Sequence, residues 1–294
     1  MTAALRSLLR LRPLEVLVDA TGPPTFELPD GLADVYGGSL GFTQPRLYAN
    51  LVASVDGVTA IPGRPQSSHL IAAGSEHDRF VIGLLRASAD AVLIGAGTLR
   101  DSPRTRWTPE HAYPAAADLY AELRRRRGRP PQPTLAVLTG SGRIDPRHPG
   151  LSERTLVLTS EQGAAELGRS LPRTAAIVPL GSRPPLAPHV AVEALRAGGH
   201  ELILCEGGPS LLGGFVRAGL VDELFLTLSP ALGGRPAAEP RLSLLEEADI
   251  PELLVLRLLS LRRAGSHLFL RYLLPTAAGS RVDGAPRRPG GEAG

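Results

Sequence analysis

The sequence predicts an α/β protein of three layers, α/β/α, around a mostly parallel central sheet with antiparallel C-terminal strands. Short apolar segments of strand length alternate with helical stretches of roughly 10–15 residues, which is the pattern of βαβ units. The strand segments are apolar almost throughout, as expected of parallel strands buried on both faces. The last two strand segments have no helix between them, so we expect them to form an antiparallel edge.

The apolar pattern divides the chain into three parts. Residues 1–45 are short apolar pieces broken by glycine and proline, and we expect an N-terminal extension that packs on the core. Residues 46–275 carry the regular alternation and form the predicted α/β domain. Residues 276–294 are mainly Gly, Pro, Ala and Arg with little apolar content, which predicts a disordered tail.

Strands are predicted where short apolar runs are bounded by polar or turn residues. In chain order they are Leu47–Ser54, Ala89–Gly95, Leu135–Thr139, Thr155–Thr159, Ala175–Leu180, Glu201–Cys205, Leu224–Ser229, Leu253–Ser260 and His267–Leu274. The clearest helical spacing predicts a helix over Ser75–Ala87, whose apolar stripe consists of Phe80, Val81, Leu84 and Leu85. The other predicted helices are Glu110–Arg127, Glu161–Ser170, Ala187–Ala197 and Ser210–Ala218.

Composition excludes several classes of enzyme. All 32 Lys and Arg residues are arginine, so a P-loop ATPase, a protein kinase and a pyridoxal-phosphate enzyme would each lack the lysine they need. The single cysteine excludes an intrachain disulfide and a cysteine-rich zinc site. The net charge of +3 does not indicate nucleic acid, because the arginines are scattered along the chain. Without a long apolar run or a signal-peptide pattern, we expect a cytoplasmic protein that binds no membrane.

Two predicted strands end in glycine-rich turns. The turn Ile94–Thr98 (IGAGT) follows one strand, and Cys205–Ser210 (CEGGPS) follows another and leads directly into a helix. Ligands of open α/β sheets bind at the carboxyl ends of the strands, where glycines and a helix N-terminus favour phosphate. Either turn alone is more simply a tight βα connection, but two in one sheet favour a phosphate-bearing ligand. Neither turn is a GxGxxG fingerprint.

The segment Asn50–Thr59 (NLVASVDGVT) places polar groups at the end of an apolar strand, and Asn50 is the one asparagine of the chain. These groups either bind a polar ligand or belong to a turn built by Asp56 and Gly57, which is a common turn dipeptide. Residue chemistry leaves the two interpretations equally open.

Three other features have plainer explanations. The run Arg124–Arg127 is interpreted as a solvated helix end, where cations suit the helix dipole, rather than as an RNA-binding patch. Cys205 lies inside a strand and is expected to be a small core residue. The seven histidines show no ligand-like spacing, so no metal is expected.

The chain resembles one family in a set of motifs that follow each other in order. They are Asn50–Thr59, Leu85–Thr98 (LRASADAVLIGAGT), Glu206–Leu211 (EGGPSL), Leu220–Leu224 (LVDEL) and Phe269–Tyr272 (FLRY). Over residues 46–274 this set is similar to the C-terminal reductase domain of RibD-type deaminase-reductases of riboflavin biosynthesis, in a stand-alone form without the deaminase. The resemblance implies a dihydrofolate-reductase-like fold, typically homodimeric. It also implies NADPH as cofactor and reduction of the ribosyl group of 5-amino-6-(5-phosphoribosylamino)uracil to ribityl.

The resemblance also assigns residues to the site. Substrate positions match Asn50, Ser67, Arg86, Arg106 and Glu206. The two arginines would hold the phosphate with their guanidinium forks. Cofactor positions match Val52, Gly95, Gly97, Thr98, Asp101, Gly207, Gly208, Pro209, Ser210, Leu211, Leu212, Gly213 and Gly214. Gly140 and Arg143, just past a predicted strand, are chosen for the 2′-phosphate of NADPH. The catalytic candidates are Glu206, for the ribose hydroxyls, and Asp56, as the acid that delivers a proton.

Three alternative functions remain open. The same fold and cofactor would suit a reductase of dihydrofolate or another pterin, with Asp56 as the carboxylate that faces the ring. The chain would otherwise be a non-catalytic NADPH-binding sensor. An RNA-binding protein that uses Arg124–Arg129 is the alternative from a different class.

Overall fold

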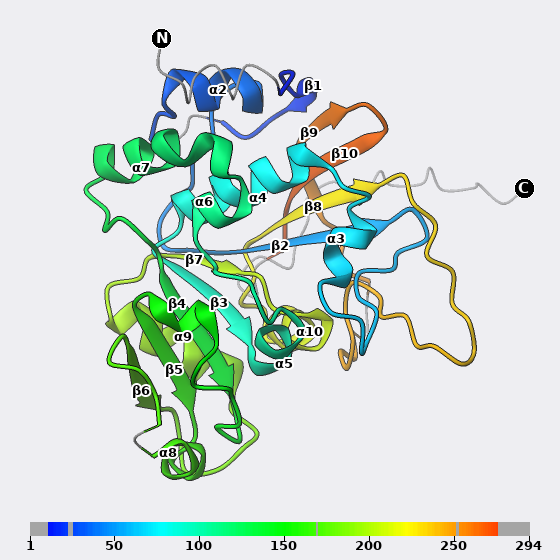
Figure 1. Cartoon of the computed structure of the whole chain (residues 1–294). Helices are drawn as coiled ribbons and strands as arrows, with labels where there is room; N and C mark the ends of the chain where they lie inside the picture. Colours follow the sequence, from blue (N-terminus) through cyan, green and yellow to red (C-terminus); the bar gives the residue numbers. More distant parts are fainter. Residues whose placement is uncertain (1–10, 23–25, 169, 251–252, 276–294) are drawn as a thin grey trace, which may run out of the picture.

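The computed structural model describes residues 11–22, 26–168, 170–250 and 253–275. One sheet of ten strands runs through them in the order β1-β9-β10-β8-β2-β7-β3-β4-β5-β6 (Figure 1). The strands from β8 to β6 are parallel, and β10, β9 and β1 pair antiparallel. The predicted α/β fold with antiparallel C-terminal strands is therefore confirmed. The predicted disordered tail, residues 276–294, lies outside the described residues.

The elements have the following bounds. The strands are β1 Glu15–Asp19, β2 Arg46–Ser54, β3 Ala91–Gly95, β4 Thr134–Thr139, β5 Thr155–Thr159, β6 Ala175–Pro179, β7 Leu202–Cys205, β8 Glu223–Ser229, β9 Arg257–Ala264 and β10 His267–Leu273. The helices are α2 Asp30–Tyr36, α3 Ser67–Ile71, α4 Glu76–Ser88, α5 Ala96–Asp101, α6 Pro109–Ala112, α7 Ala117–Arg126, α8 Glu161–Leu167, α9 Pro188–Ala197 and α10 Pro209–Arg217. Two short 3₁₀ helices, η1 Pro114–Ala116 and η2 Pro149–Ser152, complete the set.

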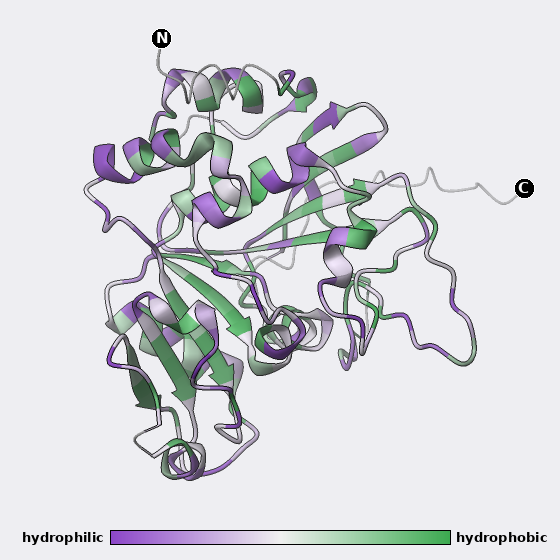
Figure 2. Ribbon diagram, viewed as in Figure 1, coloured by the Kyte–Doolittle hydropathy of each residue, from purple (hydrophilic) through white to green (hydrophobic). Residues whose placement is uncertain are grey.

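Helices cover both faces of the parallel strands. Side chains of α2, α4 and α7 form one core cluster with Tyr48 and Phe225, and side chains of α9 and α10 form a second cluster on the opposite face. Figure 2 shows β3, β4 and β5 as almost uniformly apolar ribbons between these layers. This is the burial on two faces that the apolar strand segments predict. In the part of the chain that the structure describes, no helix is long and apolar enough to span a membrane.

Two predicted elements differ from those observed. The predicted helix Glu110–Arg127 is three shorter pieces, α6, η1 and α7, because Pro114 cannot donate the backbone N–H that a continuous helix needs. The strand predicted from Leu253 begins instead at Arg257, which pairs with Leu273, the last residue of β10. Residues before Arg257 have no strand opposite them, and Leu253 is exposed.

The sheet opens at the end of β7, and this opening positions the site. β7 ends at Cys205, which lies beside Ala49 of β2 and Leu93 of β3. Beyond this point β2 continues to Ser54 and β3 to Gly95 without a strand between them. The two strands then diverge (Figure 1). Groups at the ends of β3 and β7 therefore face the second half of β2 across the opening.

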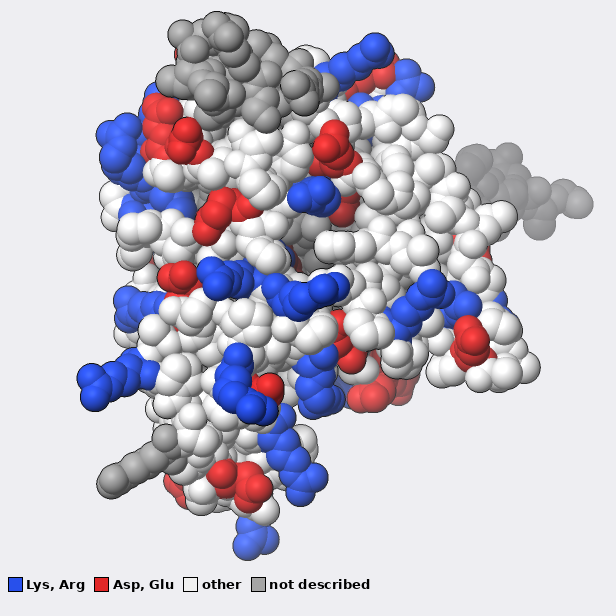
Figure 3. Space-filling view, in the orientation of Figure 1, with Lys and Arg blue, Asp and Glu red and all other residues white. Residues whose placement is uncertain are grey.

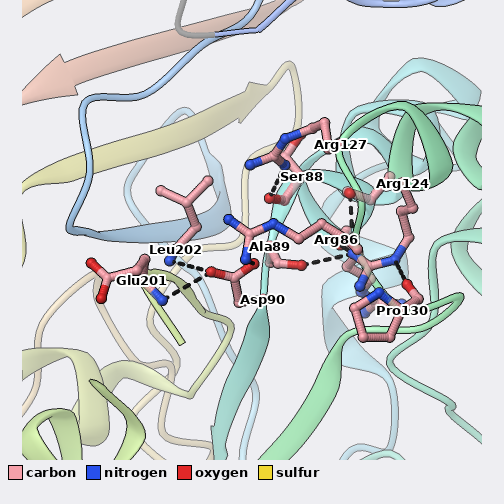
Figure 4. A network of polar contacts seen from close by, with 11 residues as sticks. Arg86, Ser88, Ala89, Asp90, Arg124, Arg127, Pro130, Glu201 and Leu202 are labelled. Atoms are coloured by element: carbon pink, nitrogen blue, oxygen red, sulfur yellow. Dashed lines mark hydrogen bonds and ion pairs between the residues drawn. The ribbon is translucent and has the colours of Figure 1, made fainter. Parts of the chain in front are cut away.

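The arginine run at the end of α7 is structural. Arg124 is 1% exposed, and its guanidinium donates to the carbonyl oxygens of Ala89 at 2.7 Å, Pro130 at 2.7 Å and Ala87 at 3.1 Å (Figure 4). The interpretation of the run as a solvated helix end is therefore wrong for Arg124. The same contacts remove this guanidinium from any RNA-binding surface.

Two neighbouring arginines complete this network. Arg127 donates to the Ser88 carbonyl at 2.6 Å and lies over the Phe26 ring. Arg129 pairs with Asp90 at 2.6 Å. The other carboxylate oxygen of Asp90 accepts the backbone N–H groups of residues 201 and 202, both at 2.9 Å. The network ties the end of α4 to the starts of β3 and β7.

Replacing Arg124 by alanine should therefore destabilise the fold strongly. The change leaves several buried carbonyl groups without their donor, and we expect a loss of about 3 kcal/mol in the free energy of unfolding. Urea unfolding of Arg124→Ala beside Arg125→Ala measures this, because Arg125 is exposed one residue away and its loss should cost less than about 0.5 kcal/mol. Equal stability of the two variants would contradict the structural role.

Candidate active site

The candidate site lies where the sheet opens. Asn50 stands in the middle of β2, one residue beyond the Ala49–Cys205 pair, so it lies next to Glu206. It is 9% exposed and lies inside the strand, as the predicted strand Leu47–Ser54 has it. Figure 3 shows this face hollowed near its middle, with basic side chains bordering the hollow. In Figure 1 the same region lies in front of β2, between α4 and α6 on one side and α5 on the other.

Arg86 and Glu206 form a nearly buried ion pair at this opening. Arg86 Nη2 lies 2.7 Å from Glu206 Oε2, and Nε lies 3.0 and 3.1 Å from the two carboxylate oxygens. Arg86 Nη1 donates to the carbonyl oxygens of Arg106 and Thr108, each at 3.2 Å. α4 supplies the arginine from its last turn, and the turn after β7 supplies the glutamate. Residues 120 positions apart in sequence thus meet at one point.

The ion pair corrects the predicted role of Arg86. Of the five N–H donors of a guanidinium, four are used by Glu206 and the two carbonyls. The one N–H donor that remains cannot form the two parallel hydrogen bonds to a phosphate that are predicted for Arg86. Instead, Arg86 fixes the carboxylate of Glu206 and holds residues 106–108 against α4. Glu206 Oε1 receives a single bond from Arg86, so it can still accept from a hydroxyl.

Two helix N-termini meet beside the ion pair. The backbone N–H of Gly208, the N-cap of α10, donates to Thr98 Oγ1 in the first turn of α5 at 3.0 Å. Neither helix has a side-chain cap hydrogen bond. Both therefore keep unsatisfied first-turn N–H groups and a positive dipole end, which together favour an anionic ligand.

The predicted cofactor glycines fall into two groups. Gly208 has φ −67°, and a Cβ there would find Thr98 Oγ1 at 3.7 Å, an ordinary contact. Neither backbone conformation nor packing therefore requires glycine at this position, and the space beside its Cα is open. Pro209 and Ser210 follow at the start of α10, and Gly97 lies in the first turn of α5.

The other members of this set have packing roles. A Cβ on Gly95 or Gly207 would meet the side chain of Leu211 at 3.1 and 2.6 Å, so these glycines make room for Leu211. Three residues further along α10 make packing contacts instead. They are Leu212, which is 1% exposed in the core, Gly213, whose Cβ would meet the Glu246 carbonyl at 2.3 Å, and Gly214, which faces Pro188 of α9.

Asp56 anchors a turn. Its carboxylate accepts from Ser54 Oγ at 2.6 Å and from the backbone N–H groups of Gly233 and Gly234 at 2.9 and 2.6 Å. These hydrogen bonds, led by that of Ser54, lower the pKa of Asp56 to about 2. The carboxyl group is therefore ionised at neutral pH, where it accepts the hydrogen bonds of this turn. The turn interpretation of this segment holds: Asp56 anchors the loop after β8.

The remaining predicted residues lie around the opening. Val52 of β2 faces the α3 side, where it packs with Val58 and Ile71. Ser67 begins α3 and its hydroxyl accepts the Ile61 N–H at 3.2 Å. Asp101 is exposed at the end of α5. Arg143 is exposed beyond β4, and Gly140 packs against Pro184.

Basic groups that the sequence analysis missed gather at the rim. Desolvation, and then the charges of Arg86 and Arg106, lower the pKa of His111. Desolvation and the charges of Arg79 and Arg86 act in the same direction on the pKa of His69. Arg79 Nε donates to the Ala112 carbonyl at 3.0 Å, which ties α4 to α6. These side chains come from α3, α4 and α6, so no local motif could have grouped them.

The described residues offer neither a metal-binding cluster nor a reactive thiol at the site. The described residues contain no group of three or more His, Cys, Asp or Glu side chains able to hold a metal. Burial raises the pKa of the Cys205 thiol to about 12. Its place as a small core residue is confirmed, and it is inert as a nucleophile.

In open parallel sheets, ligands bind at the carboxyl ends of the strands, and helix N-termini favour phosphate; this opening has both features. The model of the RibD C-terminal domain family matches residues 45–270. The chain belongs to this family, as the motifs predict, and the predicted class of enzyme, an oxidoreductase, is confirmed with it.

Named relatives and solved structures agree with this assignment. The 2,5-diamino-6-ribosylamino-4(3H)-pyrimidinone 5′-phosphate reductase of Archaeoglobus fulgidus is 29% identical over 197 residues, which cover 65% of this chain and 84% of the relative. The riboflavin biosynthesis protein RibD of Escherichia coli is 30% identical over 205 residues, 66% of this chain and 50% of the relative. A pyrimidine reductase-like protein from Corynebacterium diphtheriae has a TM-score of 0.59 at 26% identity, covering 87% of this chain and 99% of that chain.

Proposed function

We propose that the protein reduces the ribosyl group of a 6-ribosylamino-pyrimidine 5′-phosphate to ribityl, with NADPH as hydride donor. The observation that carries this proposal is the Arg86–Glu206 pair at the opening of the sheet, next to two uncapped helix N-termini. The sequence analysis favours 5-amino-6-(5-phosphoribosylamino)uracil. The stand-alone Archaeoglobus relative is named for the 2,5-diamino-pyrimidinone instead. The two pyrimidines share the ribose phosphate that the site would hold.

The residues present fit NADPH. The open Cβ position of Gly208 and the free N–H groups of α5 and α10 suit its pyrophosphate. Arg143, exposed past the end of β4, suits the 2′-phosphate. The cofactor supplies the hydride, so the protein has to position the sugar and hold a proton. Glu206, fixed by Arg86, would accept from a ribose hydroxyl through Oε1.

The substrate phosphate is assigned to the rim rather than to Arg86. Arg106 is exposed, its backbone is held by Arg86, and Arg79 and His111 lie nearby. Guanidinium groups in this position supply the charge and the fork geometry that a sugar phosphate requires.

The test is consumption of NADPH by the purified protein with each pyrimidine and, separately, with dihydrofolate. We expect turnover with at least one ribosylamino-pyrimidine phosphate and none with dihydrofolate. Binding of NADPH without turnover on any of them would favour the sensor instead.

Gly208 gives a direct test of the cofactor position. The extended backbone of this residue suits a β-branched side chain, so Gly208→Val should fold normally but place its methyl groups where the phosphates approach. We expect NADPH affinity to fall by roughly 10- to 100-fold, with the melting temperature nearly unchanged. Gly213→Ala is the matched control: its Cβ would meet the Glu246 carbonyl at 2.3 Å, so it should lower the melting temperature. Normal NADPH affinity in Gly208→Val would contradict the cofactor placement.

We also propose that the protein is a homodimer that pairs through the antiparallel end of the sheet. One face of β8, β9 and β10 is buried beneath α2 and α4. The cross-strand neighbours on this face are Phe225, Thr227, Ser260, Arg262, Phe269 and Arg271. The alternating residues on the other face are nearly all leucine and only half-buried: Leu226, Leu228, Leu258, Leu261, Leu268 and Leu270. A flat apolar face of this kind is typical of an isologous dimer contact.

A further inference from the structure

Asp78 is a buried carboxyl group that takes no part in the Arg86–Glu206 contacts. It lies in the first turn of α4 and is 4% exposed. Its backbone N–H is accepted by the capping Ser75 hydroxyl, so the cap does not involve its carboxylate. No ion pair with Asp78 is found among the residues that the structure describes. Asp78 therefore differs from Glu206, which is paired with Arg86 at 2.7 Å.

The surroundings of Asp78 lead to the site. Its side chain is hydrogen-bonded to the hydroxyl of Thr227 on β8. Thr227 lies beside Val52 of β2 in the register, on the face that also carries Asn50. Thr227 and Asn50 both line one small void beside β8 and β2. Asn50 in turn lies next to Glu206. A polar path thus runs from Asp78 through Thr227 to the opening of the sheet.

We propose that Asp78 holds the proton consumed in the reduction and passes it through the Thr227 hydroxyl to the substrate side of Asn50. This inference rests on the proposed function. When bound, the dihydronicotinamide would supply the hydride that reduces the sugar carbon C1, and it would itself be oxidised to the nicotinamide. The oxygen or nitrogen that was doubly bonded to C1 takes up a proton. Thr227 gives up its hydroxyl proton and receives that of Asp78, and the resulting carboxylate is reprotonated from solvent.

The charges around Asp78 suit this role. Burial, the dominant effect, raises the pKa of Asp78 to about 6. The hydrogen bond from Thr227 and the charge of His267 on β10 act in the opposite direction, while Glu206 adds to the rise. An acid with a pKa near the working pH combines a protonated fraction with a good driving force for transfer. Asp56, the acid that the sequence analysis names, accepts hydrogen bonds from Ser54, Gly233 and Gly234, which lower its pKa to about 2.

The pH dependence of kcat/KM tests the proposal. The wild-type rate should fall above about pH 6 as Asp78 ionises. In Asp78→Asn this limb should vanish, and kcat/KM at the optimum should drop by roughly 10²-fold while NADPH affinity is retained. Glu76→Gln, an exposed change in the same helical turn, should leave the profile unchanged. A uniform loss at every pH in Asp78→Asn, or no loss, would overturn the proposal.

A second variant and a stability measurement guard against simple misfolding. Thr227→Val removes the hydroxyl that relays the proton, so kcat/KM should fall as it does in Asp78→Asn. It also removes a hydrogen bond that lowers the pKa of Asp78, so the alkaline limb of the remaining activity should move to higher pH; full activity with an unmoved limb contradicts the relay. Because the folded-state pKa is raised, the ionised carboxylate destabilises the fold above about pH 6. Asp78→Asn should therefore melt no lower than wild type at alkaline pH. If the wild-type enzyme turns over no pyrimidine, the proposed function fails; if it turns over with an unaltered profile in both variants, only the proton path fails.

Discussion

Replacing Arg86 by methionine should both destabilise the protein and abolish its turnover. The change leaves Glu206 as a nearly buried carboxylate without a counter-ion, and it removes the donor for two carbonyl groups of the segment before α6. Breaking a buried pair in this way typically lowers the free energy of unfolding by about 3–5 kcal/mol. Turnover should fall because Glu206 is no longer oriented toward the sugar. Denaturant unfolding and NADPH oxidation measure the two effects on one preparation.

A double variant separates stability from catalysis. Apolar residues in place of both charges are often tolerated at a buried ion pair, so Arg86→Met combined with Glu206→Leu should recover most of the lost stability. Activity should not return with it, because the carboxylate that accepts from the sugar is gone. Recovery of turnover in the double variant would contradict the role given to Glu206, and a stable Arg86→Met single variant would contradict the burial argument.

Placing an arginine at Leu270 should separate the dimer. Leu270 lies between Leu226 and Leu261 in the register, at the centre of the half-exposed leucine face. The position is open enough in one subunit for a longer charged side chain to reach water. In a pair of subunits the two charges would face each other in an apolar contact, where an unpaired charge is strongly unfavourable. Light scattering after gel filtration should therefore report a dimer for wild type and a monomer for Leu270→Arg.

The matched control is an equally apolar residue away from the sheet. Leu232 is 79% exposed in the loop after β8, and Leu232→Arg should leave the dimer intact. A monomeric wild-type protein, or a dimer that survives Leu270→Arg, would place the contact elsewhere.

The parallel half of the fold is predictable because its signals are local. Apolar runs of strand length mark β2, β3, β4 and β5 to within about two residues, and the amphipathic stripe marks α4. Elements that a local pattern does not define were missed, among them α3 and α5, which contain only 5 and 6 residues. Their positions depend on tertiary contacts such as the hydrogen bond between Gly208 and Thr98.

The contacts of the candidate site, which join residues far apart in the sequence, are even less predictable from local patterns. Arg86 and Glu206 are both identified from the sequence, but nothing in it says that they bind each other, since 120 positions separate them. The role of Arg86 therefore changes from phosphate ligand to support for a carboxylate. The sequence predicts Arg124 to be a surface residue, because an arginine at a helix end gives the same sequence pattern whether it is solvated or buried. The carbonyls that it satisfies come from another helix end.

Asp78 could have been found from the sequence. It precedes Val81 by three positions and Leu85 by seven, so it falls on the apolar stripe of α4. A carboxylate on a buried face is unusual and calls for a partner or a function. The apolar stripe that predicts the helix thus also places this charged residue on the buried face.

Transfer of a labelled hydride tests the central claim most directly. NADPH carrying deuterium at the transferred position of the nicotinamide should be incubated with the protein and the ribosylamino-pyrimidine phosphate. We expect a ribityl product with one deuterium, located by mass spectrometry on the carbon that was C1 of the ribose. An unlabelled product, a label on the pyrimidine ring, or recovery of the unreduced sugar with bound NADPH intact would contradict the proposed reaction.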